Sequence, residues 1–252
     1  MLTIVTGDLF VHNGTMADSE SKPGRTARAI AHDEMQRRIL DAARKQLTTV
    51  GPAQLSLRAI ARELGVVSSA IYRYVASRDE LITRLILDSF TTLADTVATA
   101  CSQAKADPTV QFSTWASTLR AWALEHPYDW ALIYGVPIAG YAAPSDTLDP
   151  ARRVNDPVLA LYGQLEPNLQ VGQTVDASEA ALRPLRAMLE EHYASGPGTA
   201  GVATAMMWAW SSVHGFINLE LGGHFQGSAS ETTPVFAAIV DQLAHQLVGS
   251  AE

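Results

Sequence analysis

Apolar residues recur at every third or fourth position along most of the 252-residue chain, which is the spacing that places them on one face of an α-helix. No segment alternates between apolar and polar residues over more than a few positions, as a half-buried strand would. The predicted helical segments are 33–50, 58–65, 68–75, 77–104, 108–126, 128–134, 149–165, 178–193, 199–221 and 232–248. We therefore expect an all-α fold of about nine or ten helices.

Residues that begin or end helices divide the chain into three parts. Gly51 and Pro52 end the first long helix, and Ser77 and Glu80 form an S-x-x-E capping box at the start of another. The first 31 residues contain no clear helix, and 1–31 is predicted to be a flexible N-terminal extension. Residues 32–78 are predicted to form a small three-helix module, and residues 79–252 a larger helical domain.

The stretch 57–78, LRAIARELGVVSSAIYRYVASR, has the pattern of two short helices joined by a tight turn. Ile60 and Leu64 lie four residues apart on one face of the first helix, and Gly65 tolerates the left-handed conformation of a helix end. This is the pattern of a helix-turn-helix motif, whose second helix enters the major groove of DNA. An ordinary helix pair within an all-α domain has the same spacing, so the pattern alone leaves both interpretations open.

The distribution of charge favours the DNA interpretation. Residues 22–84 contain twelve Lys and Arg against six Asp and Glu, a net charge of +6, whereas the residues beyond 90 contain six against sixteen, a net charge of −10. This asymmetry is expected when only one end of a protein meets phosphate. The single cysteine, Cys101, fits a reducing cytoplasm, and no apolar run is long enough to span a membrane.

The N-terminal extension has two interpretations. Its basic residues, Lys22, Arg25 and Arg28, form either an arm that touches the minor groove or nearby phosphates, or a solvated tail. Met16 is a second candidate start of translation, because MADSESKPGR has the composition of a natural flexible N-terminus.

The segment 36–87 strongly resembles the DNA-binding domain of TetR/AcrR-type regulators. Those proteins show a TxxxIAxxLGVS-like helix followed by xxxxYxHFxxKxxL, and this chain has LSLRAIARELGVVSSAIYRYVASRDEL. The matching positions are Ile60, Ala61, Leu64, Gly65, Val66 and Tyr72. The resemblance implies a DNA-binding regulator in which a long fourth helix joins the module to a body that binds small effectors.

The chain departs from the family pattern at a few positions. Tyr74, Val75 and Arg78 stand where the family usually has His, Phe and Lys. Val67 replaces the usual Ser or Thr at the start of the second helix, and Ser68 is expected to act as the N-cap instead.

The motif supplies side chains for both kinds of DNA contact, to base edges and to phosphates. The candidates for base contacts are Arg58, Ser68, Ser69, Ala70 and Arg73. The residues assigned to phosphates are Tyr72, Tyr74 and Arg78.

Aromatic residues gather in the larger domain, which contains all five tryptophans. They either form its core or line an apolar pocket, and the resemblance supports a pocket for a small effector. The candidate pocket residues are Trp115, Trp122, Trp130, Tyr134, Met207, Trp210 and His214.

The segment 210–215 resembles the W-x-x-x-H-G signature of one subgroup of these regulators. Trp210 and His214 share a helix face. His214 either hydrogen-bonds an effector, titrates near neutral pH, or is a buried neutral histidine bonded to a neighbouring carbonyl or hydroxyl. Gly215 is expected to let another helix approach closely.

The last two helices carry more apolar surface than one side of a monomer needs. The residues that suit a two-fold interface are Leu219, Leu221, Val235, Ile239, Leu243 and Leu247. A homodimer would present two recognition helices to a palindromic operator on double-stranded DNA.

These observations predict a cytoplasmic, homodimeric repressor that a small apolar or aromatic effector releases from its operator. The alternatives are an activator of the same family, and a helical small-molecule-binding protein whose DNA-binding module is vestigial. The sequence has no P-loop, GxGxxG, HExxH, GxSxG or CxxC motif, and its histidines lack metal-ligand spacing. No enzyme activity, cofactor or metal is therefore predicted.

Overall fold

The computed structural model describes residues 26–161, 181–193 and 200–248, which form eleven α-helices, two short 3₁₀-helices and no strand. The all-α fold is thereby confirmed. The α-helices are α1 (Ala27–Val50), α2 (Leu57–Glu63), α3 (Ser68–Ile71), α4 (Arg78–Gln103), α5 (Pro108–Glu125), α6 (Pro127–Tyr134), α7 (Leu148–Arg153), α8 (Asp156–Leu159), α10 (Arg183–Tyr193), α11 (Ala200–Leu221) and α12 (Thr233–Val248). The 3₁₀-helices are η1 (Pro52–Gln54) and η2 (Ser145–Thr147).

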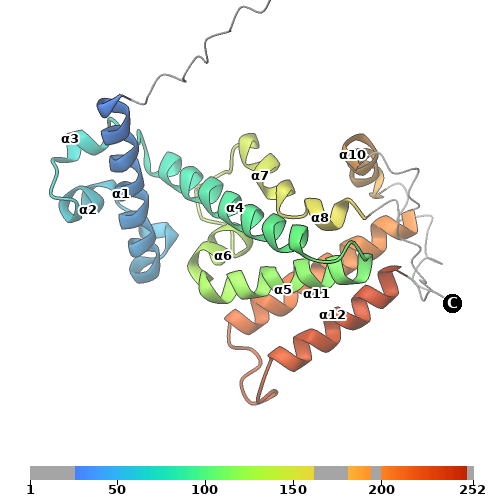
Figure 1. The fold of residues 1–252 in the computed structure, drawn as a ribbon. Helices are drawn as coiled ribbons and strands as arrows, with labels where there is room; N and C mark the ends of the chain where they lie inside the picture. Colours follow the sequence, from blue (N-terminus) through green and yellow to red (C-terminus); the bar gives the residue numbers. More distant parts are fainter. Residues whose placement is uncertain (1–25, 162–180, 194–199, 249–252) are drawn as a thin grey trace, which may run out of the picture.

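The helices form a small module and a larger body (Figure 1). Helices α1–α3 gather at one end of the molecule, and α4 runs from them along the body. Helix α5 packs between α4 and α12, and α11 also contacts α5 and α12. The short helices cover this core, because α7 packs on α4, α8 on α5 and α10 on α11.

The N-terminal module is held together by one apolar face from each helix. Ile39 of α1, Ile60 of α2 and Ile71 of α3 are each almost fully buried. Burying a side chain of this size contributes about 1.5–3 kcal/mol, so three such residues suffice to fix short helices against α1. Gly65 adopts a φ of 68°, which confirms the left-handed turn between α2 and α3.

Side-chain caps fix the helix starts that the sequence indicates. The Ser77 hydroxyl accepts a hydrogen bond from the Glu80 amide at 3.1 Å, and the Glu80 carboxylate accepts one from the Ala76 amide at 2.6 Å. Glu80 therefore reaches one residue before the cap, a variant of the predicted capping box. Asp107 caps α5 through the Val110 amide at 3.0 Å.

Helix α1 begins earlier than predicted. It starts at Ala27, within the segment assigned to the flexible extension, and the Thr26 hydroxyl accepts a hydrogen bond from the Ala29 amide at 3.2 Å. The prediction was wrong here because it followed the apolar stripe, whereas alanine-rich helix ends form by propensity and capping.

Three further predictions need correction. The second helix of the motif was predicted over 68–75, but α3 ends at Ile71 and residues 72–74 form a turn. The predicted helix 149–165 is divided into α7 and α8, because Pro157 has no amide hydrogen to donate to the Arg153 carbonyl, where α7 ends. Helix α3 has Val67 at its N-cap without a side-chain hydrogen bond, so Ser68 does not cap it. Residues 162–165 and 178–180 of the predicted helices lie outside the described residues.

None of the described helices is long and apolar enough to cross a membrane.

Candidate DNA interface and effector pocket

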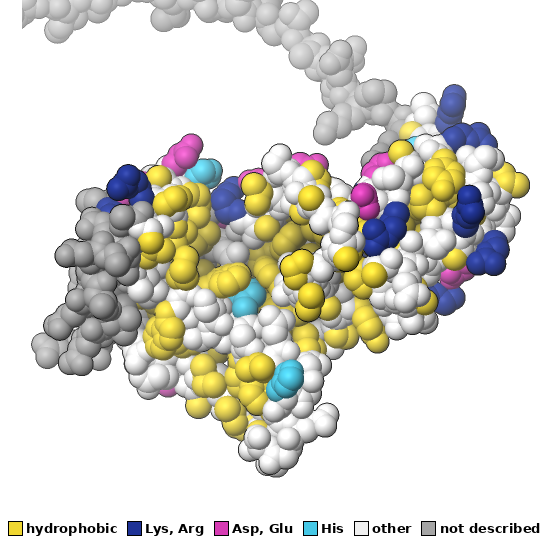
Figure 2. Space-filling view, turned by 180° about the vertical axis from the view of Figure 1, so that it is seen from behind, with side chains coloured by type: hydrophobic (Ala, Val, Ile, Leu, Met, Phe, Trp, Pro, Cys, Tyr) yellow, Lys and Arg dark blue, Asp and Glu magenta, His cyan; other side chains and the backbone are white. Residues whose placement is uncertain are grey.

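Arginines without protein partners surround the helix-turn-helix pair. Arg58, Arg62 and Arg73 are exposed, and within the described residues no hydrogen bond or ion pair involves their side chains. Two nearby basic residues are neutralised by contrast, since Lys45 of α1 pairs with Glu63 at 2.9 Å and Arg84 of α4 pairs with Glu80 at 2.6 Å. Figure 2 shows Lys and Arg side chains gathered over this end of the molecule. The free guanidinium groups are available to an external anion.

The start of α3 is open to solvent. Val67 is 69% exposed, Ser68 and Ser69 are exposed, and Ala70 is half-buried. Tyr72, just after α3, is 48% exposed. These side chains can reach a partner without any rearrangement of the module.

The other two residues assigned to phosphates are engaged inside the protein. Tyr74 is half-buried, and its ring centroid lies 4.9 Å from that of His32. The Arg78 guanidinium donates to the carbonyl oxygens of Pro52 at 2.9 Å and Ala53 at 3.2 Å. Arg78 therefore fixes η1 against the start of α4, a role that sequence spacing does not reveal.

The early start of α1 adds Arg28 to the neighbourhood of α3. Arg28 is exposed in the first turn of α1, four residues before His32 and on the same helix face. Because His32 packs on Tyr74, this face lies beside the chain that follows α3. Lys22 and Arg25 lie outside the described residues.

An ion-pair cluster, which we call the Arg44 clasp, joins the module to the body. Arg44 of α1 bonds to Asp88 of α4 and, at 3.2 Å, to Asp129 of α6. The Ser89 hydroxyl donates to the same Asp129 oxygen at 2.7 Å. Burial lowers the pKa of Arg44, but its hydrogen bonds and the charges of the two aspartates outweigh burial and raise it. The Arg44 guanidinium therefore stays charged, and its bonds hold α1 against α4 and α6.

An aromatic cluster surrounds the buried His214. His214 stacks on Trp210 with ring centroids 4.1 Å apart and on Trp130 at 5.4 Å, and Tyr134 meets it edge-on at 4.7 Å. The His214 Nδ1 lies 2.9 Å from the Trp210 carbonyl oxygen. Burial lowers the pKa of His214 to about 4. Of the alternatives for His214, the structure therefore supports a neutral buried histidine.

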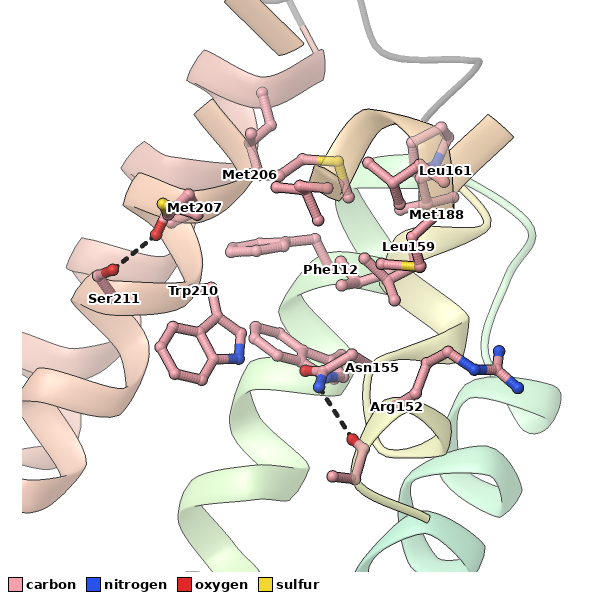
Figure 3. Close-up of a pocket in the computed structure, with 18 of the residues that line it drawn as sticks. Phe112, Arg152, Asn155, Leu159, Leu161, Met188, Met206, Met207, Trp210 and Ser211 are labelled. Atoms are coloured by element: carbon pink, nitrogen blue, oxygen red, sulfur yellow. Dashed lines mark hydrogen bonds between the residues drawn. The ribbon is translucent and has the colours of Figure 1, made fainter. Parts of the chain in front are cut away.

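A cavity of about 520 Å³ opens between α5, α7, α8, α10, α11 and α12 (Figure 3). It is lined by Pro108, Phe112, Trp115, Leu148, Ala151, Arg152, Asn155, Val158, Leu159, Leu161, Leu185, Met188, Leu189, Met206, Met207, Ala209, Trp210, Ser211, Leu247 and Val248. Its volume lies within the range of small-molecule sites, and most of its wall is apolar.

The seven candidate pocket residues fall into three groups. Trp115, Met207 and Trp210 line the cavity. Trp130, Tyr134 and His214 form the aromatic cluster, which touches the cavity only through the two tryptophans that line it. Trp122 is buried beside a separate surface groove formed by α4, α5 and α12.

Sequence reasoning missed Asn155 and Met188, which also line the cavity. Asn155 follows the short helix α7, where no periodicity indicates a wall. Met188 and Leu189 lie on α10, three and four residues after Leu185. This helical spacing was the available sign that the three residues share one apolar face.

The last two helices present a smaller free apolar surface than predicted. Leu219 and Val235 are 46% and 43% exposed, whereas Leu243 and Leu247 are buried within the single chain. A Cβ atom built on Gly215 would find no heavy atom of the described residues within 4 Å. The expected close helix approach at Gly215 is therefore absent from the described part of one chain.

Comparison with known proteins identifies relatives of both parts. Residues 39–85 match a family described as "Bacterial regulatory proteins, tetR family", and residues 112–243 match "Tetracyclin repressor-like, C-terminal domain". The HTH-type transcriptional regulator Rv1816 of Mycobacterium tuberculosis is 39% identical over 199 residues, which cover 77% of this chain and 84% of the relative.

Solved structures share the same fold. The crystal structure of SCO4313, described as a regulatory protein, is 32% identical with a TM-score of 0.69, and the match covers 86% of this chain and 98% of that one. The TetR family regulator PfmR from Thermus thermophilus is 18% identical with a TM-score of 0.51, over 83% of this chain and 98% of that one. The latter similarity concerns the fold alone.

Proposed function

The chain belongs to the TetR family of DNA-binding transcriptional regulators and is not an enzyme, and on this premise we propose that it is a ligand-responsive repressor acting in the cytoplasm. The observation that carries the proposal is the contrast between the free arginines around α2 and α3 and the apolar cavity in the body. One surface suits an external polyanion, and the other suits a small apolar or aromatic effector.

The DNA contacts divide by side-chain chemistry. Arg58, Arg73, Ser68 and Ser69 would contact base edges, and the Ala70 methyl group would face a thymine methyl group. The phosphate contacts would come from Tyr72 together with Arg62 and Arg28, which are exposed beside the motif. Tyr74 and Arg78 would act by positioning the module, because their polar or aromatic groups are engaged within it.

The protein would act as a homodimer on a palindromic operator. A four-residue α3 offers few base contacts, and two copies about 34–36 Å apart would read two half-sites. Exposed Trp208 and Val235 lie along a surface groove between α11 and α12 and support an interface there. Replacing Trp208 by Glu should yield a monomer with weak operator binding. Val136, which is exposed in a loop, provides the control, because Val136→Glu should remain dimeric in sedimentation experiments.

Effector binding would reach the DNA-binding module through a chain of contacts. Trp210 lines the cavity and stacks on His214, which stacks on Trp130. Trp130 follows Asp129, whose carboxylate is part of the Arg44 clasp. An effector that changes the packing of Trp210 could therefore alter the position of α6 against α1. Its influence on DNA affinity equals the difference between its affinities for the two states.

The direct test is a titration of the full chain against DNA from upstream of its own gene, followed by fluorescence anisotropy. We expect saturable binding that exceeds binding to scrambled DNA by at least about 1,000-fold. Equal binding to both DNAs would favour a vestigial module and overturn the proposal. Transcription of the same fragment in vitro distinguishes a repressor from an activator. A repressor lowers the transcript yield and an activator raises it.

A further inference from the structure

The cavity wall offers few free polar groups to a ligand. Among the described lining residues, the polar side-chain atoms belong to Arg152, Asn155, Ser211 and the indole nitrogens of Trp115 and Trp210. The Trp115 indole donates to the Val154 carbonyl oxygen at 3.2 Å, and the Ser211 hydroxyl donates to the Met207 carbonyl oxygen at 2.7 Å. Both donors are therefore already used within the protein.

The charge of Arg152 is also committed to the protein. Its guanidinium bonds to Asp149 and Asp156, each at 2.9 Å. Within the described residues, this group of one positive and two negative charges carries a net negative charge at the edge of the cavity. To reach Arg152, a ligand carboxylate or phosphate would have to displace one of the two aspartates. It would then lie close to the other aspartate, which repels it, so the cavity does not favour anions.

Two polar groups of the wall lack a hydrogen-bond partner among the described residues. The Trp210 indole N–H is a donor on a ring that is 39% exposed, whereas the Asn155 side-chain oxygen is a buried acceptor. The Asn155 side-chain nitrogen donates to the Ala151 carbonyl oxygen at 3.3 Å (Figure 3), which fixes the orientation of the amide, since a flipped group would set two oxygens against each other. Asn155 also occupies the N-cap of α8 without capping it through its side chain. An acceptor without a donor thus remains at the cavity wall.

We propose that the effector is an uncharged, mainly apolar molecule that carries a hydrogen-bond donor, a hydroxyl or an amide N–H, for Asn155 Oδ1. This inference rests on the proposed function, because it assigns the ligand class of the same cavity. Three methionines, Met188, Met206 and Met207, line the cavity and adapt to ligands of different outline. The apolar wall would accept the body of the ligand, and Asn155 would select its polar group.

Three matched probes test the ligand class on the full chain by calorimetric titration at neutral pH. They are 4-phenylphenol, which has a donor, 4-methylbiphenyl, which is similar in size but has none, and biphenyl-4-carboxylate, which is an anion. One hydrogen bond to an otherwise unpaired acceptor corresponds to about tenfold in affinity, so the phenol should bind about tenfold more tightly than the other two. Equal affinities, a preference for the carboxylate, or no binding of the phenol would overturn the proposal.

Two variants locate the donor's partner. Asn155→Leu should weaken 4-phenylphenol about tenfold and leave 4-methylbiphenyl unchanged or tighter, because the unpaired acceptor is gone. Asn155→Leu should not lower the melting temperature of the ligand-free protein, because it removes a buried acceptor that has no donor. Ser211→Ala is the matched control and should change all affinities less than about twofold, because its hydroxyl already donates to Met207. A phenol preference that survives Asn155→Leu would contradict the assignment; if that variant fails to fold, the probe ranking on the wild-type chain decides.

Operator release is measured separately, by anisotropy on the upstream DNA with each probe present. If the phenol binds through Asn155 without weakening DNA binding, the ligand class stands and the effector role in the proposed function fails. If DNA binding responds equally to all three probes, the proposed function stands and the ligand class fails.

Discussion

Arginine has opposite surroundings in the two parts of this molecule. In the module, Arg58, Arg62 and Arg73 are exposed and have no partner among the described residues. In the body, Arg120 donates to both oxygens of Glu220 at 2.6 and 2.7 Å, with both side chains largely buried, and Arg152 lies between two aspartates. The same side chain is thus free to meet an external partner at one end and holds helices together at the other.

This difference shows why net charge alone misleads. The whole chain carries a formal net charge of −8, yet the unpaired Arg58, Arg62 and Arg73 all lie in the helix-turn-helix pair or just after it. In the body, Arg120, Arg152 and Arg153 each pair with a neighbouring carboxylate, and Arg152 is the only one of these three that lines the cavity. This pairing is the basis for proposing a neutral ligand. The comparison predicts that removing a body arginine lowers stability, whereas removing a module arginine lowers DNA affinity. The reverse pattern would contradict it.

The largest effect is expected in the body, at Arg120. Arg120→Met leaves the Glu220 carboxylate largely buried without its partner, which should lower the free energy of unfolding by about 3 kcal/mol. Arg62→Ala, at an exposed and unpaired position, should change it by less than about 0.5 kcal/mol. Urea unfolding followed by circular dichroism measures both. Equal losses in the two variants would remove the distinction between the two kinds of arginine.

The buried His214 should make stability fall as the solution is acidified. The folded chain keeps His214 neutral down to its pKa of about 4, whereas the unfolded chain binds a proton below its ordinary value of 6.5. Unfolding is therefore favoured as pH falls, by about 2–3 kcal/mol between pH 6.5 and 4.5. His214→Phe should remove this part of the pH dependence while keeping the ring stack. A parallel pH profile for the wild type and the variant would refute the neutral buried histidine.

Replacing Arg73 should change the affinity and base preference of DNA binding but not the stability of the protein. Arg73→Ala should weaken operator binding by about 1–3 kcal/mol and relax the preference at one base pair of each half-site. Its melting temperature should stay at the wild-type value because the side chain has no partner in the described structure. The measurement is anisotropy across a set of single-base operator variants. Undiminished selectivity in the variant would show that Arg73 contacts no base.

The Arg44 clasp should affect communication between the two parts more than it affects either part alone. Arg44→Gln should reduce the effect of a bound effector on operator affinity by about 0.5–2 kcal/mol. Arg37→Gln is the matched control, because the pairs that Arg37 forms with described residues are both within its own helix, to Glu34 and Asp41. The measurement is operator affinity with and without 4-phenylphenol. Equal coupling in both variants would exclude the clasp as the connection.

Local signals predicted much of the fold. Gly51, Gly65 and Ser77 each mark a helix boundary through the chemistry of one or two residues, and the structure places boundaries at or next to them. The start of α1 was missed because Thr26 and the alanines after it lack an apolar stripe.

The site was predicted less completely because its contacts join distant parts of the chain. Trp130 donates to Asn218, 88 residues away, and no local pattern shows that this removes Trp130 from the cavity wall. Arg78 meets the carbonyl oxygen of Pro52 for an equally non-local reason. Periodicity indicates which face of a helix is buried, but the neighbour on that face depends on the whole packing.

The most direct test of the central claim, that the free arginines of the module serve DNA, is the salt dependence of operator binding. If Arg28 and Arg62 each neutralise a phosphate in both copies of a dimer, log affinity should fall with log salt with a slope of about −4 or steeper. Arg62→Ala should reduce that slope by about two, whereas Lys105→Ala, which removes the same charge from an exposed site on the body, should leave it unchanged. A slope near zero, or equal slopes for the wild type and Arg62→Ala, would contradict the account.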